Sequence, residues 1–222
     1  MAKKSNREED ARLEGIVNDF LDKYFFNQDF EKVQWVKDKK EQTSGVDVYL
    51  TSEKFKLDNA KVDIKSAVKY STRYLPTYAL EVSFINKWGE DCQGWLVNDK
   101  LVTEYYLLLY PRSQKYYEEM QVADDIDYIE YYLVKKTDIM DFLNSRGYDK
   151  ERLKEVSDGM REEYIQEVRK GNGDPGTLRW NSDSQNFYFT LSGTLAEEPV
   201  NVVIKRQVYE HYSRAKGKIE KR

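Results

Sequence analysis

The segments SGVDVYL (residues 44–50) and VDIKSA (residues 62–67) carry charged residues inside runs that otherwise alternate like β-strands. Successive side chains of a strand point to opposite faces of a sheet. In the first segment the apolar residues therefore share one face, and Asp47 lies on the other. In the second, Asp63 and Lys65 project together from the face opposite the apolar side chains. If the two strands pair, two carboxylates and an ammonium group share one patch.

The length and amino-acid composition of the chain are those of a globular protein. The chain has 222 residues, of which 40% are hydrophobic and 34% charged, with only four prolines. This length is sufficient for a sizeable core, and we expect a single domain that spans residues 1–222.

Charge and cysteine content suggest a cytoplasmic location. The chain has one cysteine, so it forms no internal disulfide, and its start is charged where a signal peptide would be apolar. No apolar stretch approaches the ~20 residues of a spanning helix, so no membrane partner is expected. The net charge of −4 gives no overall attraction to phosphate backbones. The basic clusters at 32–40 and 213–222 are interpreted as a solvated face and a frayed end.

The sequence pattern of the first half of the chain predicts one helix followed by strands. Ser5 and Glu8 form a capping box, and apolar residues then recur at helical spacing, which predicts a helix over residues 6–26. Strand patterns follow at 30–38, 45–53, 60–70, 77–86, 92–98 and 104–113. Consecutive antiparallel pairing is the simplest arrangement of the first three of these strands.

The second half mixes both kinds of element. A strand is predicted over 125–136, then a helix that Thr137 caps and that stops at Gly147, then a longer helix over 149–170. Residues 171–176 have the composition of a loop. Segments 186–193 and 199–209 are predicted to close the fold as a hairpin or strand pair.

The carboxylates favour metal-assisted phosphodiester cleavage. That reaction needs an activated water and neutralisation of phosphate charge, which a divalent ion held by carboxylates supplies. Mg²⁺ typically takes one or two protein carboxylates, so Asp47 and Asp63 suffice, with a backbone carbonyl near Ile64 as a third ligand. Lys65 would then lie beside the attacking water or the scissile phosphate, as a cation or a proton carrier.

The order helix, strand, Gly-x-Asp strand, Asp-x-Lys strand resembles the PD-(D/E)XK nuclease superfamily, which includes many restriction endonucleases and phage or repair nucleases. The matching residues are Gly45, Val46, Asp47, Asp63, Ile64 and Lys65, with Gln42 in the preceding turn. The resemblance implies that Asp47 and Asp63 bind Mg²⁺ or Mn²⁺ and that Lys65 is the catalytic lysine. It also implies a further acid on the first helix, for which Glu14 is preferred to Asp10 and Glu9.

The resemblance implies an α/β (α+β) fold with a restriction-endonuclease-like core. In that fold an N-terminal helix precedes a mixed, largely antiparallel central sheet flanked by helices. Residues 6–110 would form the core, and residues 111–222 would add helices and strands that pack on it. The sequence departs from the family in having Val46 in place of proline, and residues 69–84 leave little room for the helix that usually follows the lysine strand.

Four further residues are candidates for the site. Glu81 lies opposite the apolar face of its predicted strand, where it would extend the catalytic site or neutralise Lys65, or simply face water on an edge strand. Lys69 and Arg73 follow the lysine strand and would contact phosphates, the alternative being ordinary solvated bases. The resemblance adds Gln42 to the candidate substrate-binding residues.

The 18 tyrosines suggest a second binding mode. Tyr116 and Tyr117, next to Arg112 and Lys115, are the best candidates for stacking on single-stranded nucleic acid. The simpler interpretation of the tyrosines as a group is that they fill half-buried sheet positions. Because His211 is the only histidine, histidine-based zinc sites and Ser-His catalysis are disfavoured.

Two functions follow from these features. The first is a Mg²⁺-dependent nuclease that acts on DNA in restriction, phage or repair, with DNA preferred to RNA as the partner. The second is a non-catalytic protein that binds nucleic acid or protein on a degenerate nuclease scaffold. A homodimer or a partner subunit would compensate for the weak attraction of an acidic chain to duplex DNA.

Overall fold

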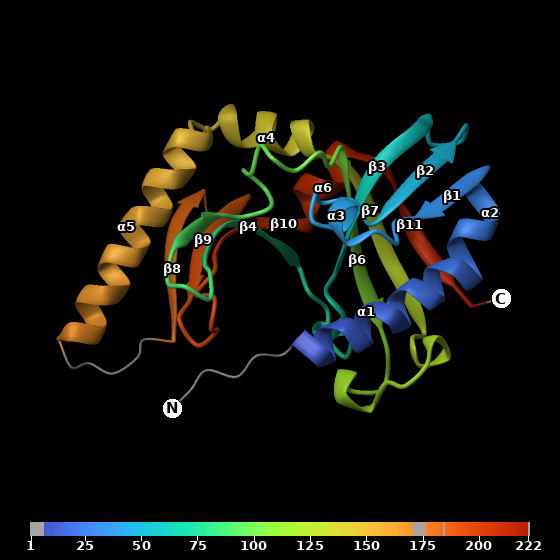
Figure 1. Cartoon of the computed structure of the whole chain (residues 1–222), viewed down its shortest axis with the longest axis horizontal. Coiled ribbons are helices and arrows are strands. Elements are labelled where there is room, and N and C mark those ends of the chain that lie inside the picture. Colours follow the sequence, from blue (N-terminus) through green and yellow to red (C-terminus); the bar gives the residue numbers. More distant parts are fainter. Residues whose placement is uncertain (1–6, 171–175, 184, 222) are drawn as a thin grey trace. The chain divides into compact units, whose positions relative to one another are not determined.

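The computed structural model describes residues 7–170, 176–183 and 185–221 and has a mixed α/β fold. The chain divides into two compact units (Figure 1). The six-stranded unit comprises Asn6–Pro76, Lys100–Ile139 and Tyr209–Arg222, and the five-stranded unit comprises Thr77–Asp99 and Met140–Val208. Each unit therefore draws on both halves of the sequence. The single domain stays a prediction.

The six-stranded unit is built on one mixed sheet of order β1-β2-β3-β6-β7-β11. Its strands are β1 (Lys32–Trp35), β2 (Val48–Ser52), β3 (Leu57–Ser66), β6 (Tyr105–Arg112), β7 (Tyr128–Lys135) and β11 (Ser213–Glu220). All neighbours are antiparallel except β3 and β6, which run parallel and place Asp63 in register with Tyr106. This parallel pair lies in the middle of the sheet, so β3 is covered on both edges.

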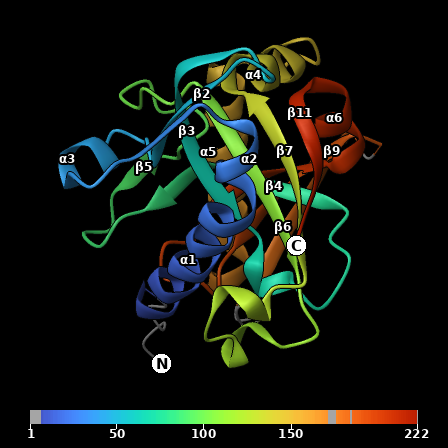
Figure 2. The same cartoon turned by 90° about the vertical axis from the view of Figure 1, so that its right-hand side faces the viewer.

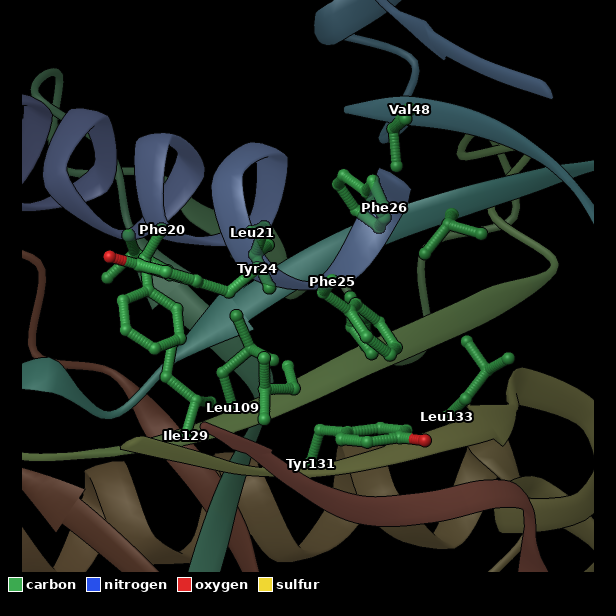
Figure 3. Packing of buried hydrophobic residues seen from close by; sticks show 14 of the residues in the cluster. Phe20, Leu21, Tyr24, Phe25, Phe26, Val48, Leu109, Ile129, Tyr131 and Leu133 are labelled. Atoms are coloured by element: carbon green, nitrogen blue, oxygen red, sulfur yellow. The ribbon is translucent and has the colours of Figure 1, made fainter. Parts of the chain in front are cut away.

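One face of this sheet is covered by the N-terminal helix, as the apolar stripe predicts. Helix α1 (Arg7–Leu21) continues into a π-helical turn, η1 (Asp22–Phe26), and a short α2 (Asn27–Asp29), in agreement with the helix predicted over 6–26. Figure 2 shows α1 lying across the sheet. In the core of Figure 3, Phe20 and Phe25 are buried against the sheet, and the ring of Phe25 lies 4.7 Å from that of Tyr131. Ser5 of the predicted capping box lies outside the described residues.

The other helices, apart from the long helix at 150–169 that is described below, have at most nine residues. They are α3 (Lys39–Gln42), η2 (Val68–Tyr70), η3 (Tyr117–Glu119), η4 (Ala123–Asp125), α4 (Lys136–Asn144) and α6 (Arg206–Tyr212). Helix α4 begins at Lys136, directly after β7, so Thr137 lies inside the helix and is not its cap. The strand β3 is followed by the single 3-10 turn η2, consistent with the little room seen in the sequence.

The five-stranded unit has an antiparallel sheet of order β5-β4-β10-β9-β8. Its strands are β4 (Thr77–Ile85), β5 (Asp91–Gln93), β8 (Thr177–Asp183), β9 (Phe187–Ser192) and β10 (Val200–Lys205). Helix α5 (Lys150–Arg169) lies against this sheet, and the Asp149 side chain caps it by accepting from Arg152 N (Figure 1). The predicted helix over 149–170 and the pairing of the last two predicted strands are confirmed.

The predicted consecutive antiparallel pairing of the first three strands is confirmed, since β2 pairs with β1 and with β3. Strand β4 pairs with β5 and β10 in the other sheet, because the edges of β3 are taken by β2 and β6. The strand predicted over 199–209 ends at Lys205 and continues as α6, and the strand predicted over 92–98 is limited to the short β5. The C-terminal basic cluster, interpreted as a frayed end, forms most of β11, which pairs with β7. No helix of the described residues is long and apolar enough to cross a membrane.

Candidate functional site

Backbone pairing fixes Asp47 against β3. Asp47 N donates to Val62 O over 2.9 Å, and Ile64 N donates to Asp47 Oδ2 over 2.7 Å. Strand β2 begins only at the next residue, so the Asp47 side chain takes the place of a strand carbonyl and extends the ladder by one step. The carboxylate is thus held beside the strand that carries Asp63 and Lys65.

Asp63 is a buried carboxyl that forms an ion pair with Lys65. The Lys65 Nζ lies 2.8 Å from Asp63 Oδ1, and the two side chains are 29% and 5% exposed respectively. The alternation predicted from the sequence is confirmed, since Val62 packs in the core beneath α1 while Asp63 points the other way. The face of the sheet that carries Asp63 is shielded from water at this position, because the neighbouring Tyr106 is fully buried.

The surroundings of Asp63 favour its neutral form. The pKa of Asp63 is raised to about 7, mainly by burial and also by the nearby Asp47 carboxylate, whereas the Lys65 ammonium opposes the shift. Two close carboxyl groups that exclude water do not both ionise readily unless a cation joins them. A cation added beside Asp47 and Asp63 would therefore replace a proton.

Glu14 on α1 belongs to the same electrostatic neighbourhood. Partial shielding from water raises its pKa, the Asp47 carboxylate raises it as well, and Lys65 lowers it. The other two candidate acids of the helix are engaged elsewhere, since Asp10 lies 2.6 Å and Glu9 lies 3.7 Å from Lys69 Nζ. The preference for Glu14 as the further acid of the site stays a prediction.

The other predicted residues make contacts of their own. Gln42 Nε2 donates to Val36 O over 3.0 Å and so supports the turn before β2. Lys69 is paired with the acids of α1, and the exposed Arg73 lies over the ring of Tyr70. Glu81 lies on β4 of the five-stranded unit, where Leu96 N donates to its main-chain oxygen. Its part in the catalytic site stays a prediction, because the strand that carries it belongs to the other unit.

A pocket of about 280 Å³ opens beside Lys65, between α1 and the segment from Ile64 to Tyr70. Two buried polar atoms, Asn18 Oδ1 and Ser66 Oγ, have no hydrogen-bond partner. Asn18 and Ser66 were not predicted as site residues. One signal was available, since Asn18 follows Glu14 by four residues and so lies on the same helical face.

The carboxylate oxygens of Asp47 and Asp63 are of the type that Mg²⁺ prefers as ligands. Nowhere in the part of the chain that the structure describes do three or more histidine, cysteine, aspartate or glutamate groups come together to hold a metal ion. Mg²⁺ nevertheless takes only one or two protein carboxylates and fills its other positions with water and substrate oxygens. The carboxylates of Asp47 and Asp63 supply two oxygen ligands of this kind, and burial is the main cause of the raised pKa of Asp63.

The turn that delivers Asp47 requires glycine. Gly45 has φ +81°, and a Cβ built there would lie 2.6 Å from Thr103 Oγ1. We expect Gly45→Ala to lower the free energy of unfolding by about 1–2 kcal/mol, measured by urea denaturation. Gly89→Ala is the matched control, because Gly89 has φ +82° but no neighbour within 4 Å of the added Cβ. Equal losses in the two variants would show that the contact with Thr103 does not matter.

Comparison with known proteins gives no relative. No family model, no curated protein and no solved structure matches the chain. The chemistry of Asp47, Asp63 and Lys65 is therefore the basis for assigning a function.

Proposed function

We propose that the six-stranded unit carries a Mg²⁺- or Mn²⁺-dependent centre that hydrolyses phosphodiester bonds of DNA. Asp47 and Asp63 would hold the ion, and Lys65 would act on the phosphate or on a proton. The observation that carries the proposal is the convergence of these three side chains, with Lys65 Nζ 2.8 Å from Asp63 Oδ1 and the Asp47 carboxylate raising the pKa of Asp63.

Each side chain has a distinct task in this proposal. A bound divalent ion supplies charge neutralisation and an acidified water. Asp47 is anchored to Ile64 N through Oδ2, which holds its carboxylate beside Asp63. Lys65 is 29% exposed, so its ammonium can leave Asp63 and face a phosphate oxygen without losing contact with water. Glu14, whose pKa is raised, can hold or accept a proton at the edge of the site.

The restriction-endonuclease-like core is part of the same proposal. Helix α1, the antiparallel run β1-β2-β3 and the mixed sheet are consistent with it. The single turn η2 stands where the family usually has a helix, and the segment that follows enters the five-stranded unit. If the proposal holds, the five-stranded unit is an insertion between the lysine strand and β6, with a second contribution from residues 140–208.

Metal binding is the first test. We expect calorimetric titration with Mn²⁺ to show one site, and Asp47→Asn to weaken binding at least tenfold because one of two charged ligands is lost. Asp58→Asn, an exposed position on the same strand as Asp63, should bind Mn²⁺ like the unmodified protein. Plasmid and single-stranded DNA should be cleaved with Mg²⁺ or Mn²⁺ and left intact in EDTA. A folded protein that binds no Mn²⁺ and cleaves no nucleic acid contradicts the proposal.

A second candidate is a non-catalytic protein that binds nucleic acid or protein on the same scaffold. It is favoured by the Lys65–Asp63 ion pair, in which a lysine already neutralises the buried carboxylate, and by the lack of a three-ligand group among the described residues. Under this alternative, the protein binds a partner but takes up no Mn²⁺. Sedimentation would show whether it acts as a homodimer.

A further inference from the structure

Three tyrosines of the six-stranded unit are unusually exposed for large aromatic side chains. Tyr70, Tyr74 and Tyr116 are 43%, 61% and 64% exposed. Single exposed aromatics are common, but a group of them marks a binding surface. We call Tyr70, Tyr74 and Tyr116 the tyrosine platform.

The platform carries two arginines that stack on its rings. The guanidinium carbon of Arg73 lies 4.9 Å from the Tyr70 ring centroid, and that of Arg112 lies 5.7 Å from the Tyr74 centroid. Within the described residues neither arginine forms a salt bridge, so both retain their charge for an anionic ligand. Aromatic rings that alternate with arginines provide stacking surfaces and phosphate contacts at short intervals.

The platform is held rigidly although its side chains are exposed. Val68 of η2 is buried in the core, and Ser113 N donates to Ser71 O over 3.2 Å, which ties the two tyrosine-bearing segments together. Turn η2 also contacts η3, which begins directly after Tyr116. Figure 2 shows the yellow-green segment that includes η3 beside α1. The backbone segments that carry the tyrosines are therefore held together before any ligand binds.

The platform adjoins the candidate active site. The pocket beside Lys65 is lined by the chain from Ile64 to Tyr70, so its far wall is the first tyrosine of the platform. Asn18 and Ser66 also line this pocket. A strand lying on the platform would reach Lys65 through this pocket.

We propose that the tyrosine platform binds single-stranded DNA, with bases stacked on the three tyrosines and phosphates at Arg73 and Arg112. The direction toward Lys65 rests on the proposed nuclease function. Stacking requires bases whose faces are open, which a duplex does not offer. Two uncommitted arginines on a chain of net charge −4 supply little of the attraction that duplex binding needs.

The platform is tested by fluorescence anisotropy in EDTA, with a labelled 20-nucleotide oligo-dT, the corresponding duplex and an abasic strand of equal length. We expect oligo-dT to bind best, and Tyr74→Ala to weaken its binding about tenfold, while Tyr74→Phe retains it. Trp88→Ala is the matched control, because Trp88 is 73% exposed and has Lys87 Nζ 4.4 Å from its ring centroid, but lies in the five-stranded unit. The slope of log affinity against log salt should be about −1.4 from two phosphate contacts.

Other outcomes overturn the inference. Equal affinity for the abasic strand would exclude stacking, a preference for duplex or for oligo-U would name a different ligand, and a dimer lost in Tyr74→Ala would show that a second copy covers the platform. Because these assays contain no metal, they separate the two proposals. Oligo-dT binding with no metal-dependent cleavage would contradict only the proposed nuclease function. Cleavage without platform-dependent binding would contradict only the proposed binding of single-stranded DNA by the platform.

Discussion

Asp63→Asn is expected to abolish metal binding and DNA cleavage while making the metal-free protein more stable above pH 7. The variant keeps the shape of the side chain but removes a charge that is buried beside Asp47. A buried carboxylate that serves a function can lower the stability of the folded protein, so its replacement can make the protein more stable. The two effects have opposite signs, so general damage to the protein cannot mimic them.

The pH dependence follows from the shifted pKa of Asp63. Burial raises this pKa from 3.8 to about 7, so the folded protein holds a proton that the unfolded chain releases. Well below pH 3.8 both states are protonated and Asp63 has no effect on the free energy of unfolding. As the pH rises toward 7 the unfolded state alone ionises, and the unmodified protein loses stability, up to about 2–4 kcal/mol above pH 7. The variant escapes this loss.

Urea denaturation of the unmodified protein and Asp63→Asn at pH 4.5 and pH 8, in EDTA, measures the effect. The difference between the two proteins should be small at pH 4.5 and favour the variant at pH 8. Asp58→Asn makes the same chemical change at an exposed position of β3 and should show no such trend. Mn²⁺ at ten times its dissociation constant should raise the stability of the unmodified protein by about 1.4 kcal/mol and leave Asp63→Asn unchanged. If Asp63→Asn is less stable than the unmodified protein at pH 8, the ionised Asp63 side chain does not destabilise the fold and the prediction is wrong.

Local patterns in the sequence predicted local structure well. The apolar stripe of α1 and the alternation around Asp47 and Asp63 depend only on residues a few positions apart, and both are confirmed. The short distance along the chain also brings Asp47 next to β3, since an antiparallel pair of neighbouring strands needs only a tight connection. This is why the core of the candidate site could be read from the sequence.

Long-range pairing could not be predicted in the same way. The parallel partner of β3 is β6, which begins about forty residues later, and the intervening β4 enters another sheet and takes Glu81 with it. The burial of Asp63 depends on that partner, because Tyr106 covers its face. Strand β11 was missed because only Ala215 and Ile219 of its eight residues are buried, too few apolar positions to show a period of two.

Lys65→Met is expected to abolish cleavage and to destabilise the protein in a pH-dependent way. Without the ammonium group, the buried Asp63 loses the interaction that lowers its pKa, so the pKa rises further. At pH 8 we expect a loss of about 2 kcal/mol in the free energy of unfolding, because an unpaired buried carboxylate is strongly unfavourable. At pH 4.5 Asp63 is protonated in the folded state and needs no cation, so the loss should nearly vanish. Lys61→Met, on the same strand, is the control and should be close to neutral at both values.

A double-mutant cycle separates the structural role of Lys65 from its proposed catalytic role. If the lysine stabilises the fold only through Asp63, Lys65→Met should have little effect on stability in the Asp63→Asn background, so the coupling energy at pH 8 equals most of the 2 kcal/mol. Metal binding should be lost with Asp63→Asn but kept with Lys65→Met, since lysine is not a ligand. Lys65→Met should therefore bind Mn²⁺, at least as tightly as before because the competing ammonium is gone, and still fail to cleave DNA. Cleavage at the normal rate by a metal-loaded Lys65→Met would leave the lysine as a counter-charge to Asp63 and remove it from the reaction.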